Sequence, residues 1–161
     1  MTSGMRLLGR PVIEEGSGSL LGVIADVLLD DDCQQVVGVL VEQRRLRRRH
    51  AVIAFEALCR CSDEAIVAAA GTALSVRESW THTLPSTTAL QGKALITSAG
   101  GVLGIIADVA FDEYDGRVTA FDVQQRTESQ SRRRTLARPD GTMVVGDAGP
   151  CCSTTTSPTW H

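Results

Sequence analysis

Arginine is the residue type in this chain with the clearest capacity for chemistry. Fifteen of the sixteen basic residues are arginine, and Lys93 is the exception. The guanidinium group presents several donors in one plane, an arrangement that suits phosphate and carboxylate groups. Two arginine clusters are therefore candidates for an anion or partner patch, with a solvated turn between strands as the structural alternative. The patch comprises Arg44, Arg45, Arg47, Arg48, Arg49, Arg132, Arg133 and Arg134.

Catalytic, metal and cofactor chemistry is not predicted. The sequence contains no phosphate-cradling glycine loop, no nucleophile elbow and no metal-binding histidine pair. The five cysteines do not form the paired C-x2-C clusters of a structural zinc site, and their odd number disfavours a disulfide framework. We therefore expect a protein that is not an enzyme and binds no metal or cofactor. The roles of Cys59, Cys61, Cys151 and Cys152 stay open.

Composition limits the remaining classes. The net charge of −3 disfavours gross attraction to nucleic acid or anionic membranes, and 43% hydrophobic residues suffice for a folded core. No apolar stretch reaches the roughly 18–20 residues that span a bilayer, so we expect no transmembrane segment. The first residues lack the apolar region and the cleavage site of a signal peptide. We therefore expect a cytoplasmic protein.

An internal repeat organises the chain. Residues 21–30, LGVIADVLLD, recur as residues 103–112, LGIIADVAFD, with seven of ten positions identical. The match continues at the same offset, 82, from residues 35–43 to residues 117–125, and an arginine run follows in both copies. Such self-similarity indicates one supersecondary unit that occurs twice.

Each copy contains about five short β segments separated by turn residues, and neither shows a helical period. A small barrel removes the exposed edges that a flat sheet of such strands would leave. The predicted fold class is therefore all-β, with two small β-barrels in tandem. We expect a first barrel at residues 5–73, a linker at 74–89, a second, shorter barrel at 90–147 and a flexible tail at 148–161.

The repeated pattern resembles the PRC-barrel family. This module is shared by the cytoplasmic part of photosynthetic reaction-centre H subunits and the C-terminal half of ribosome maturation factors. The resemblance implies a tandem PRC-barrel protein that binds protein partners and has no catalytic residues to transfer. Copy two departs from the pattern, because Ala120 stands where copy one has Gly38. The matching residues are Gly9, Val12, Gly16, Leu21, Gly22, Asp26, Asp30, Gly38 and Val41, then Gly92, Leu103, Gly104, Asp108, Asp112 and Val123.

Four repeated residues are expected to be structural. Glycine inside a strand usually marks a bulge or a close approach of two backbones, which applies to Gly22 and Gly104. A carboxylate in an apolar strand needs hydrogen-bond donors. Asp26 and Asp108 are therefore expected to accept hydrogen bonds from backbone N–H groups at a barrel corner.

The same two strands are apolar on both faces, whereas a small barrel normally wets one of them. Strict alternation would place one face of the first strand on residues 21, 23, 25, 27 and 29. We hypothesise that the outer faces pack together, either about a pseudo-twofold axis within one chain or between chains as a dimer. The positions of this barrel–barrel or dimer face are Val23, Ala25, Val27, Ile105, Ala107 and Val109.

The expected function is that of a non-catalytic adaptor, which binds a protein partner or associates with itself. One alternative is an RNA- or ribosome-associated factor that uses the arginine clusters. The chain has few aromatic residues near these clusters, which disfavours base stacking on single strands. Another alternative is an accessory protein of an electron-transfer complex at a membrane surface.

Overall fold

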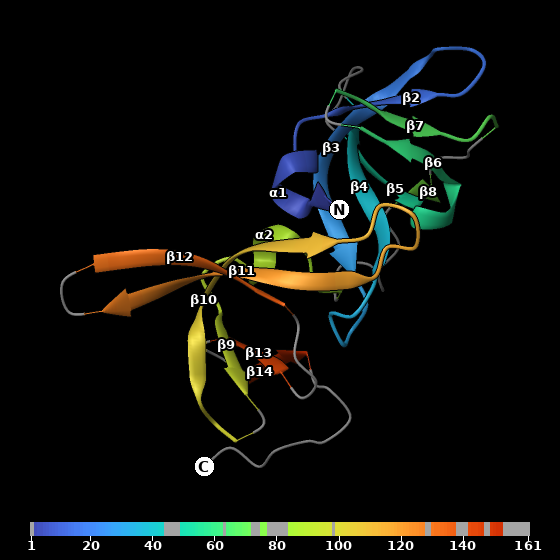
Figure 1. The fold of residues 1–161 in the computed structure, drawn as a ribbon. Coiled ribbons are helices and arrows are strands. Elements are labelled where there is room, and N and C mark those ends of the chain that lie inside the picture. The colour runs from blue at the N-terminus through green and yellow to red at the C-terminus, as the bar shows by residue number, and fades with distance from the viewer. Residues whose placement is uncertain are drawn as a thin grey trace.

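The computed structural model confirms an all-β protein. It describes residues 2–43, 49–62, 64–71, 75–76, 84–97, 99–127, 130–137, 142–146 and 149–152. Within these ranges, strands alternate with two short α-helices, α1 (Gly4–Leu7) and α2 (Thr87–Leu90), and one 3-10 helix, η1 (Phe55–Ala57). The strands form two sheets, one for each copy of the repeat (Figure 1).

The first sheet curls around the first copy. Its strands lie in the order β6-β7-β2-β3-β4-β5-β8, and neighbouring strands are antiparallel except β2 and β7. The bounds are β2 Pro11–Glu14, β3 Leu20–Leu29, β4 Val36–Gln43, β5 Arg49–Ala54, β6 Leu58–Cys61, β7 Ile66–Ala68 and β8 Ser75–Val76. Strand β8 lies within the residues expected to form the linker, 74–89, and helix α2 begins there and ends one residue beyond it.

The second sheet contains the second copy and the start of the chain. Its order is β12-β11-β10-β9-β13-β14, and β1 also pairs with β10. The bounds are β1 Thr2–Ser3, β9 Ala94–Thr97, β10 Val102–Phe111, β11 Val118–Thr127, β12 Gln130–Ala137, β13 Thr142–Gly146 and β14 Gly149–Cys152. The described strands of each sheet form an open row, so the closure of two tandem barrels stays a prediction.

The two copies match in their central hairpins and differ at their last strands. Hairpin β3–β4 corresponds to β10–β11 with the same bulged registers. The apolar segments that end the copies, however, run in opposite directions against their neighbours. Strand β7 is parallel to β2, whereas β13 is antiparallel to β9. The longer first copy inserts β6 before β7, which reverses the direction of the chain.

A β-bulge in each central strand corrects the predicted strand faces. The pairing register shifts between Ile24 and Asp26, and again between Ile106 and Asp108. One extra residue in a strand turns the following side chains to the opposite face. Val27 and Val109 are consequently fully buried in the core rather than on an outer face. Strict alternation through these strands was therefore the wrong prediction.

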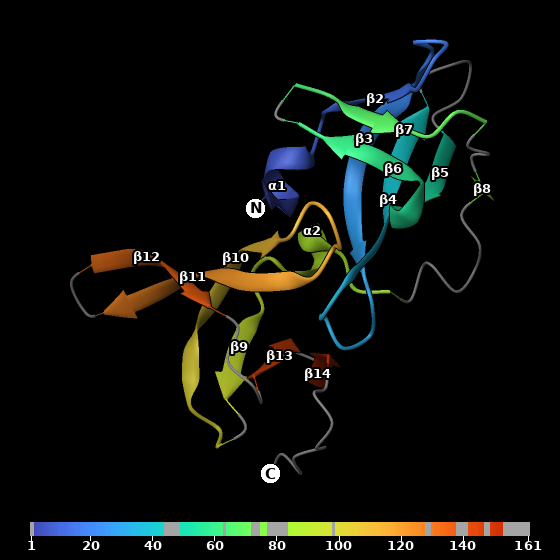
Figure 2. The ribbon, with the colours of Figure 1, turned by 45° about the vertical axis from the view of Figure 1, so that its right-hand side comes forward.

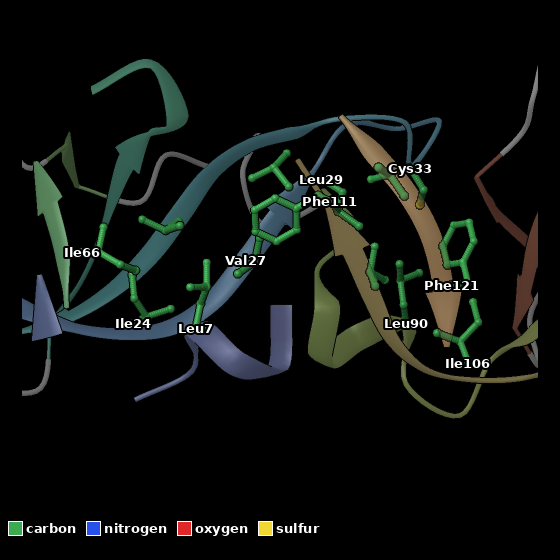
Figure 3. Close-up of a cluster of buried hydrophobic side chains, with 14 of the residues drawn as sticks. Leu7, Ile24, Val27, Leu29, Cys33, Ile66, Leu90, Ile106, Phe111 and Phe121 are labelled. Atoms are coloured by element: carbon green, nitrogen blue, oxygen red, sulfur yellow. The ribbon is translucent and has the colours of Figure 1, made fainter. Parts of the chain in front are cut away.

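A single hydrophobic core joins the two halves (Figure 3). It contains Ile24, Val27 and Leu29 from β3 together with Ile106, Val109 and Phe111 from β10. The short helices contribute Leu7 and Leu90. Because apolar burial is the main favourable term in folding, a core shared in this way makes the stability of each half depend on the other.

Candidate interaction surface

The short helix of each half is hydrogen-bonded to the central strand of the other half. The acceptors are the two repeated aspartates, Asp26 and Asp108. Oδ1 of Asp26 accepts hydrogen bonds from the backbone N–H of Val27 at 2.9 Å and of Thr88 at 3.2 Å. Oδ1 of Asp108 accepts from the N–H of Val109 at 2.7 Å and of Met5 at 3.0 Å. Each carboxylate thus satisfies donors at the start of the helix that belongs to the other half.

The repeated glycines allow close approach of neighbouring strands. A Cβ on Gly22 would lie 2.6 Å from the carbonyl oxygen of Glu42, and one on Gly104 would lie 2.9 Å from that of Gln124. Both distances are shorter than ordinary van der Waals contact. Gly22 and Gly104 therefore sit where any side chain would force the central hairpin apart.

The turns of the two central hairpins also pair with each other. The N–H of Val36 donates to the carbonyl of Gly116 at 2.7 Å, and the N–H of Val118 donates to that of Gln34 at 2.8 Å. The donors of these two bonds, Val36 and Val118, are 82 residues apart, and so are their acceptors, Gln34 and Gly116. The same offset relates Asp26 to Asp108. The halves are therefore joined about an approximate twofold axis.

The joint coincides with only part of the hypothesised strand faces, because Val27 and Val109 lie in the shared core. The contacts across the axis come from α1, α2, β1 and the hairpin turns. Val23, Ala25 and Ala107 are half-buried, and Ile105 remains 37% exposed. Packing of these four side chains against each other within one chain is thus not what joins the halves. The short helices α1 and α2 pack across the joint instead.

Instead, the outer face of the second half borders a pocket at the joint. We call it the junction pocket; its volume is about 370 Å³. Met5, from the first half, and Ile105, from the second, are each 37% exposed. Both halves contribute to the site, which therefore depends on their assembly. The lining residues are Met5, Gln91, Gly92, Ile105, Ile106, Ala107, Gln124 and Arg133.

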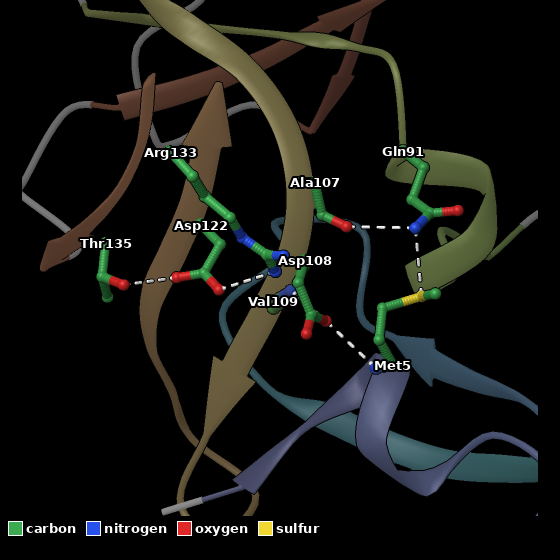
Figure 4. Close-up of polar contacts among 8 residues, drawn as sticks. All are labelled: Met5, Gln91, Ala107, Asp108, Val109, Asp122, Arg133 and Thr135. Atoms are coloured by element: carbon green, nitrogen blue, oxygen red, sulfur yellow. Dashed lines mark hydrogen bonds and ion pairs between the residues drawn. The ribbon is translucent and has the colours of Figure 1, made fainter. Parts of the chain in front are cut away.

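Hydrogen bonds fix two sides of the junction pocket (Figure 4). Nε2 of Gln91 donates to the carbonyl oxygen of Ala107 at 3.0 Å and lies 3.1 Å from Sδ of Met5. On the other side, Arg133 forms an ion pair with Asp122 at 3.0 Å. The hydroxyl of Thr135 donates to the same carboxylate at 2.6 Å. Apolar and cationic groups are thus held side by side.

The predicted arginine patch is described only in the second half. Arg132, Arg133 and Arg134 are exposed on β12, so this run lies on a strand and not in a turn. Arg44, Arg45, Arg47 and Arg48 lie outside the described residues, and of Arg49 only the backbone is described, at the start of β5.

Residues of the predicted arginine patch and of the predicted strand face therefore meet at the junction pocket. Arg133 of the patch lines the same pocket as Ile105 and Ala107 of the strand face. Sequence reasoning did not single out Met5, Gln91, Asp122 or Gln124. For Asp122 and Gln124 a signal existed, because their alternation on β11 places them on the face of Ile105. For Met5 no local signal existed, because it reaches the site from the other half.

The described cysteines and metal-ligating side chains contribute no further site to this surface. Cys33 is buried and disulfide-bonded, contrary to the expectation from the odd cysteine count, whereas Cys59 and Cys61 carry free thiols. Burial, helped by the carboxylate of Glu113, raises the pKa of the Cys61 thiol, which makes it a poor nucleophile at neutral pH. No group of three or more metal-ligating side chains occurs within the described residues.

The helices in the described part of the chain are too short and too polar to cross a bilayer. Structural disulfides are rare in the cytoplasm, so the cytoplasmic location stays a prediction. Comparison with known proteins adds no assignment: no protein-family model matches the chain, and no curated protein matches its sequence.

Proposed function

We propose that the chain is a non-catalytic adaptor of the tandem PRC-barrel type, which binds a protein partner through the junction pocket. The observation that carries the proposal is the exposed pair Met5 and Ile105, beside the guanidinium of Arg133. Methionine and arginine are enriched at protein interfaces, where an apolar centre with a polar rim is usual. The polar rim here consists of Gln91, Gln124 and Arg133.

The geometry favours a protein partner over a small molecule. The pocket is open on its outer side and mixes exposed apolar groups with amides, whereas small-molecule sites enclose most of the ligand surface. An apolar side chain of a partner would pack against Ile105, and a carboxylate or carbonyl group would meet Arg133. A second copy of the chain is the other occupant that the same chemistry admits.

Substitution of Ile105 by aspartate tests the proposal. Complexes captured from native extract by the wild-type protein and by Ile105→Asp would be compared, with Val102→Asp as the control. Val102 lies on the same strand, is 66% exposed and does not line the pocket. We expect loss of a discrete partner, or of a defined self-associated species, in Ile105→Asp alone. Equal retention by both variants would contradict the proposal.

The salt dependence of the captured complex distinguishes the adaptor from the alternative, an RNA- or ribosome-associated factor. Docking through apolar contacts is nearly insensitive to salt, whereas binding to RNA or a ribosomal surface through arginine weakens steeply as salt rises. A complex that is lost at raised salt and after ribonuclease treatment would replace the adaptor with an RNA-associated factor.

A further inference from the structure

We infer that the outer edge of β12 is a docking site for an acidic, extended segment of a protein partner, which would add to the second sheet as a further strand. The inference goes beyond the proposed function, because this edge lies apart from the apolar side of the junction pocket. Strand β12 pairs with β11 on one side, and no described strand pairs with the other side. Its hairpin with β11 projects from the body of the molecule (Figures 1 and 2).

The first half shows what such an edge accepts. Strand β5 corresponds to β12, since each pairs with the equivalent strand of its central hairpin. The outer edge of β5 is occupied by β8, with Ala51 paired to Val76 and Val52 paired to Ser75. Arg134 and Thr135 take these positions in the second half. The molecule thus contains one example of strand addition at this edge and one counterpart that no described strand covers.

Charge selects the kind of segment. Arg132, Arg133 and Arg134 are exposed in succession on β12, and only Arg133 has an ion pair among the described residues. Antiparallel pairing of two β12 edges would bring arginine opposite or beside arginine, which is unfavourable. A second copy of the chain is therefore disfavoured at this edge. Acidic side chains on a partner strand would instead reach Arg132 and Arg134.

An acidic peptide suits this edge better than RNA does. A strand edge offers backbone donors and acceptors in a row at a spacing that another extended polypeptide matches. The exposed side chains of β12 that the structure describes include no aromatic ring on which a base could stack. The arginines then add specificity and association rate to the main-chain pairing.

Binding of a defined peptide to the full-length protein tests the inference. The probe is a six-residue peptide in which glutamate alternates with valine, with both ends blocked. The comparisons are a version with lysine in place of glutamate, a glutamate version methylated at every backbone nitrogen and a hexameric uridine oligonucleotide. We expect binding of the first peptide alone, with slower hydrogen exchange of the β12 amides when it is bound.

The protein variants separate the edge from the rest of the surface. Arg132→Glu/Arg134→Glu should weaken the affinity about tenfold or more, by loss of two charge pairs and gain of repulsion. The milder variant Arg132→Gln/Arg134→Gln removes the two positive charges without adding negative ones, and it serves as a second test in case the double glutamate variant misfolds. Arg60→Glu, on the exposed edge strand β6 of the other sheet, should leave binding unchanged. Ile105→Asp should also leave it unchanged, which keeps failure of this inference distinct from failure of the junction pocket.

Three results would overturn the inference. Absence of binding by the glutamate peptide would remove it. Equal binding of the N-methylated peptide would mean that charge alone acts, without strand addition. Tighter binding of the oligonucleotide, lost in Arg132→Glu/Arg134→Glu, would make β12 an RNA surface.

Discussion

The outer faces of the two halves differ far more than the joint between them. In the first half, Leu40 on β4 is buried to 6% exposure and pairs with Val52, and β8 covers the neighbouring edge. In the second half, Asp122 and Thr135 occupy these positions, beside an edge that no described strand covers. The joint, in contrast, repeats the same aspartate and turn contacts in both directions, and the close approach at glycine repeats inside each central hairpin.

This difference indicates how the molecule divides its tasks. Residues that repeat hold the halves together, and residues that do not repeat set the surface. The first half buries Leu40 and covers the edge of β5 with its own strand β8. The second half leaves an apolar and cationic surface open, which is where an adaptor would meet its partner. Four predictions follow from this difference, on the repeated residues first and on the surface last.

Alanine at the repeated glycines should have the largest effect and should be unequal between halves. A Cβ at Gly22 would meet backbone oxygen at 2.6 Å, against 2.9 Å at Gly104. We expect Gly22→Ala to lower the free energy of unfolding by about 2–3 kcal/mol and Gly104→Ala by about 1–2 kcal/mol. Urea unfolding of both measures this.

Gly16→Ala is the matched control for the glycines. Gly16 has a φ of +86° but no atom within 4 Å of the added Cβ. Its substitution should cost only the backbone strain, about 1 kcal/mol. If Gly22→Ala were no worse than Gly16→Ala, close approach of the strands would not be the reason for glycine there.

Removal of the repeated carboxylates should come next. Asp26→Ala leaves the N–H groups of Val27 and Thr88 and the hydroxyl of Thr88 without their acceptor, whereas Asp108→Ala affects the N–H groups of Val109 and Met5. Since an unsatisfied buried donor costs about 1–3 kcal/mol, both variants should lose stability, Asp26→Ala slightly more. Thermal unfolding would give the melting temperatures of the two variants. A loss of stability in only one of them would show that the two carboxylates do not play equivalent roles in the joint.

Phe55 should show a smaller effect, specific to the longer first copy. It lies in η1 and packs edge-on against Phe111 of the other half, with ring centroids 6.4 Å apart and planes at 82°. Phe55→Leu keeps most of the apolar area, so we expect a loss of about 1 kcal/mol from the aromatic pair. A double-mutant cycle with Phe111→Leu measures the coupling; additive losses would show that the rings do not interact favourably.

The ion pair between Arg133 and Asp122 should contribute least to stability. Arg133 is 58% exposed, and exposed pairs contribute at most about 1 kcal/mol. Arg133→Ala should therefore leave the midpoint of urea unfolding nearly unchanged. Partner capture, rather than stability, is where we expect its effect. A large loss of stability would mean that this surface belongs to the core structure instead.

The repeat made the central hairpins predictable, but not the features that depend on pairing across the molecule. Residues 21–30 and 103–112 were expected to form strands, and they do. The bulges at Ala25 and Ala107 were missed, because a bulge is fixed by the register of the neighbouring strand rather than by the alanine itself. The faces of Val27 and Val109 were therefore predicted wrongly.

The short helices were missed for a related reason. Gly4–Leu7 and Thr87–Leu90 span one turn each, too short for a helical period to appear in the sequence. Each helix packs against the central strands of both halves, β3 and β10, which stabilises it in the folded molecule. Consequently, the contribution of Met5 to the junction pocket could not be predicted from the second copy alone.

The pairing of Thr2–Ser3 with β10 has a consequence for synthesis on the ribosome. Their partners Ala110 and Phe111 emerge roughly a hundred residues after Thr2 and Ser3. Helix α2, in contrast, finds β3 already present when it leaves the exit tunnel. Closing so long a loop carries an entropic cost before any contact offsets it. The pairing of Thr2–Ser3 therefore forms only after β10 has emerged, long after these two residues themselves.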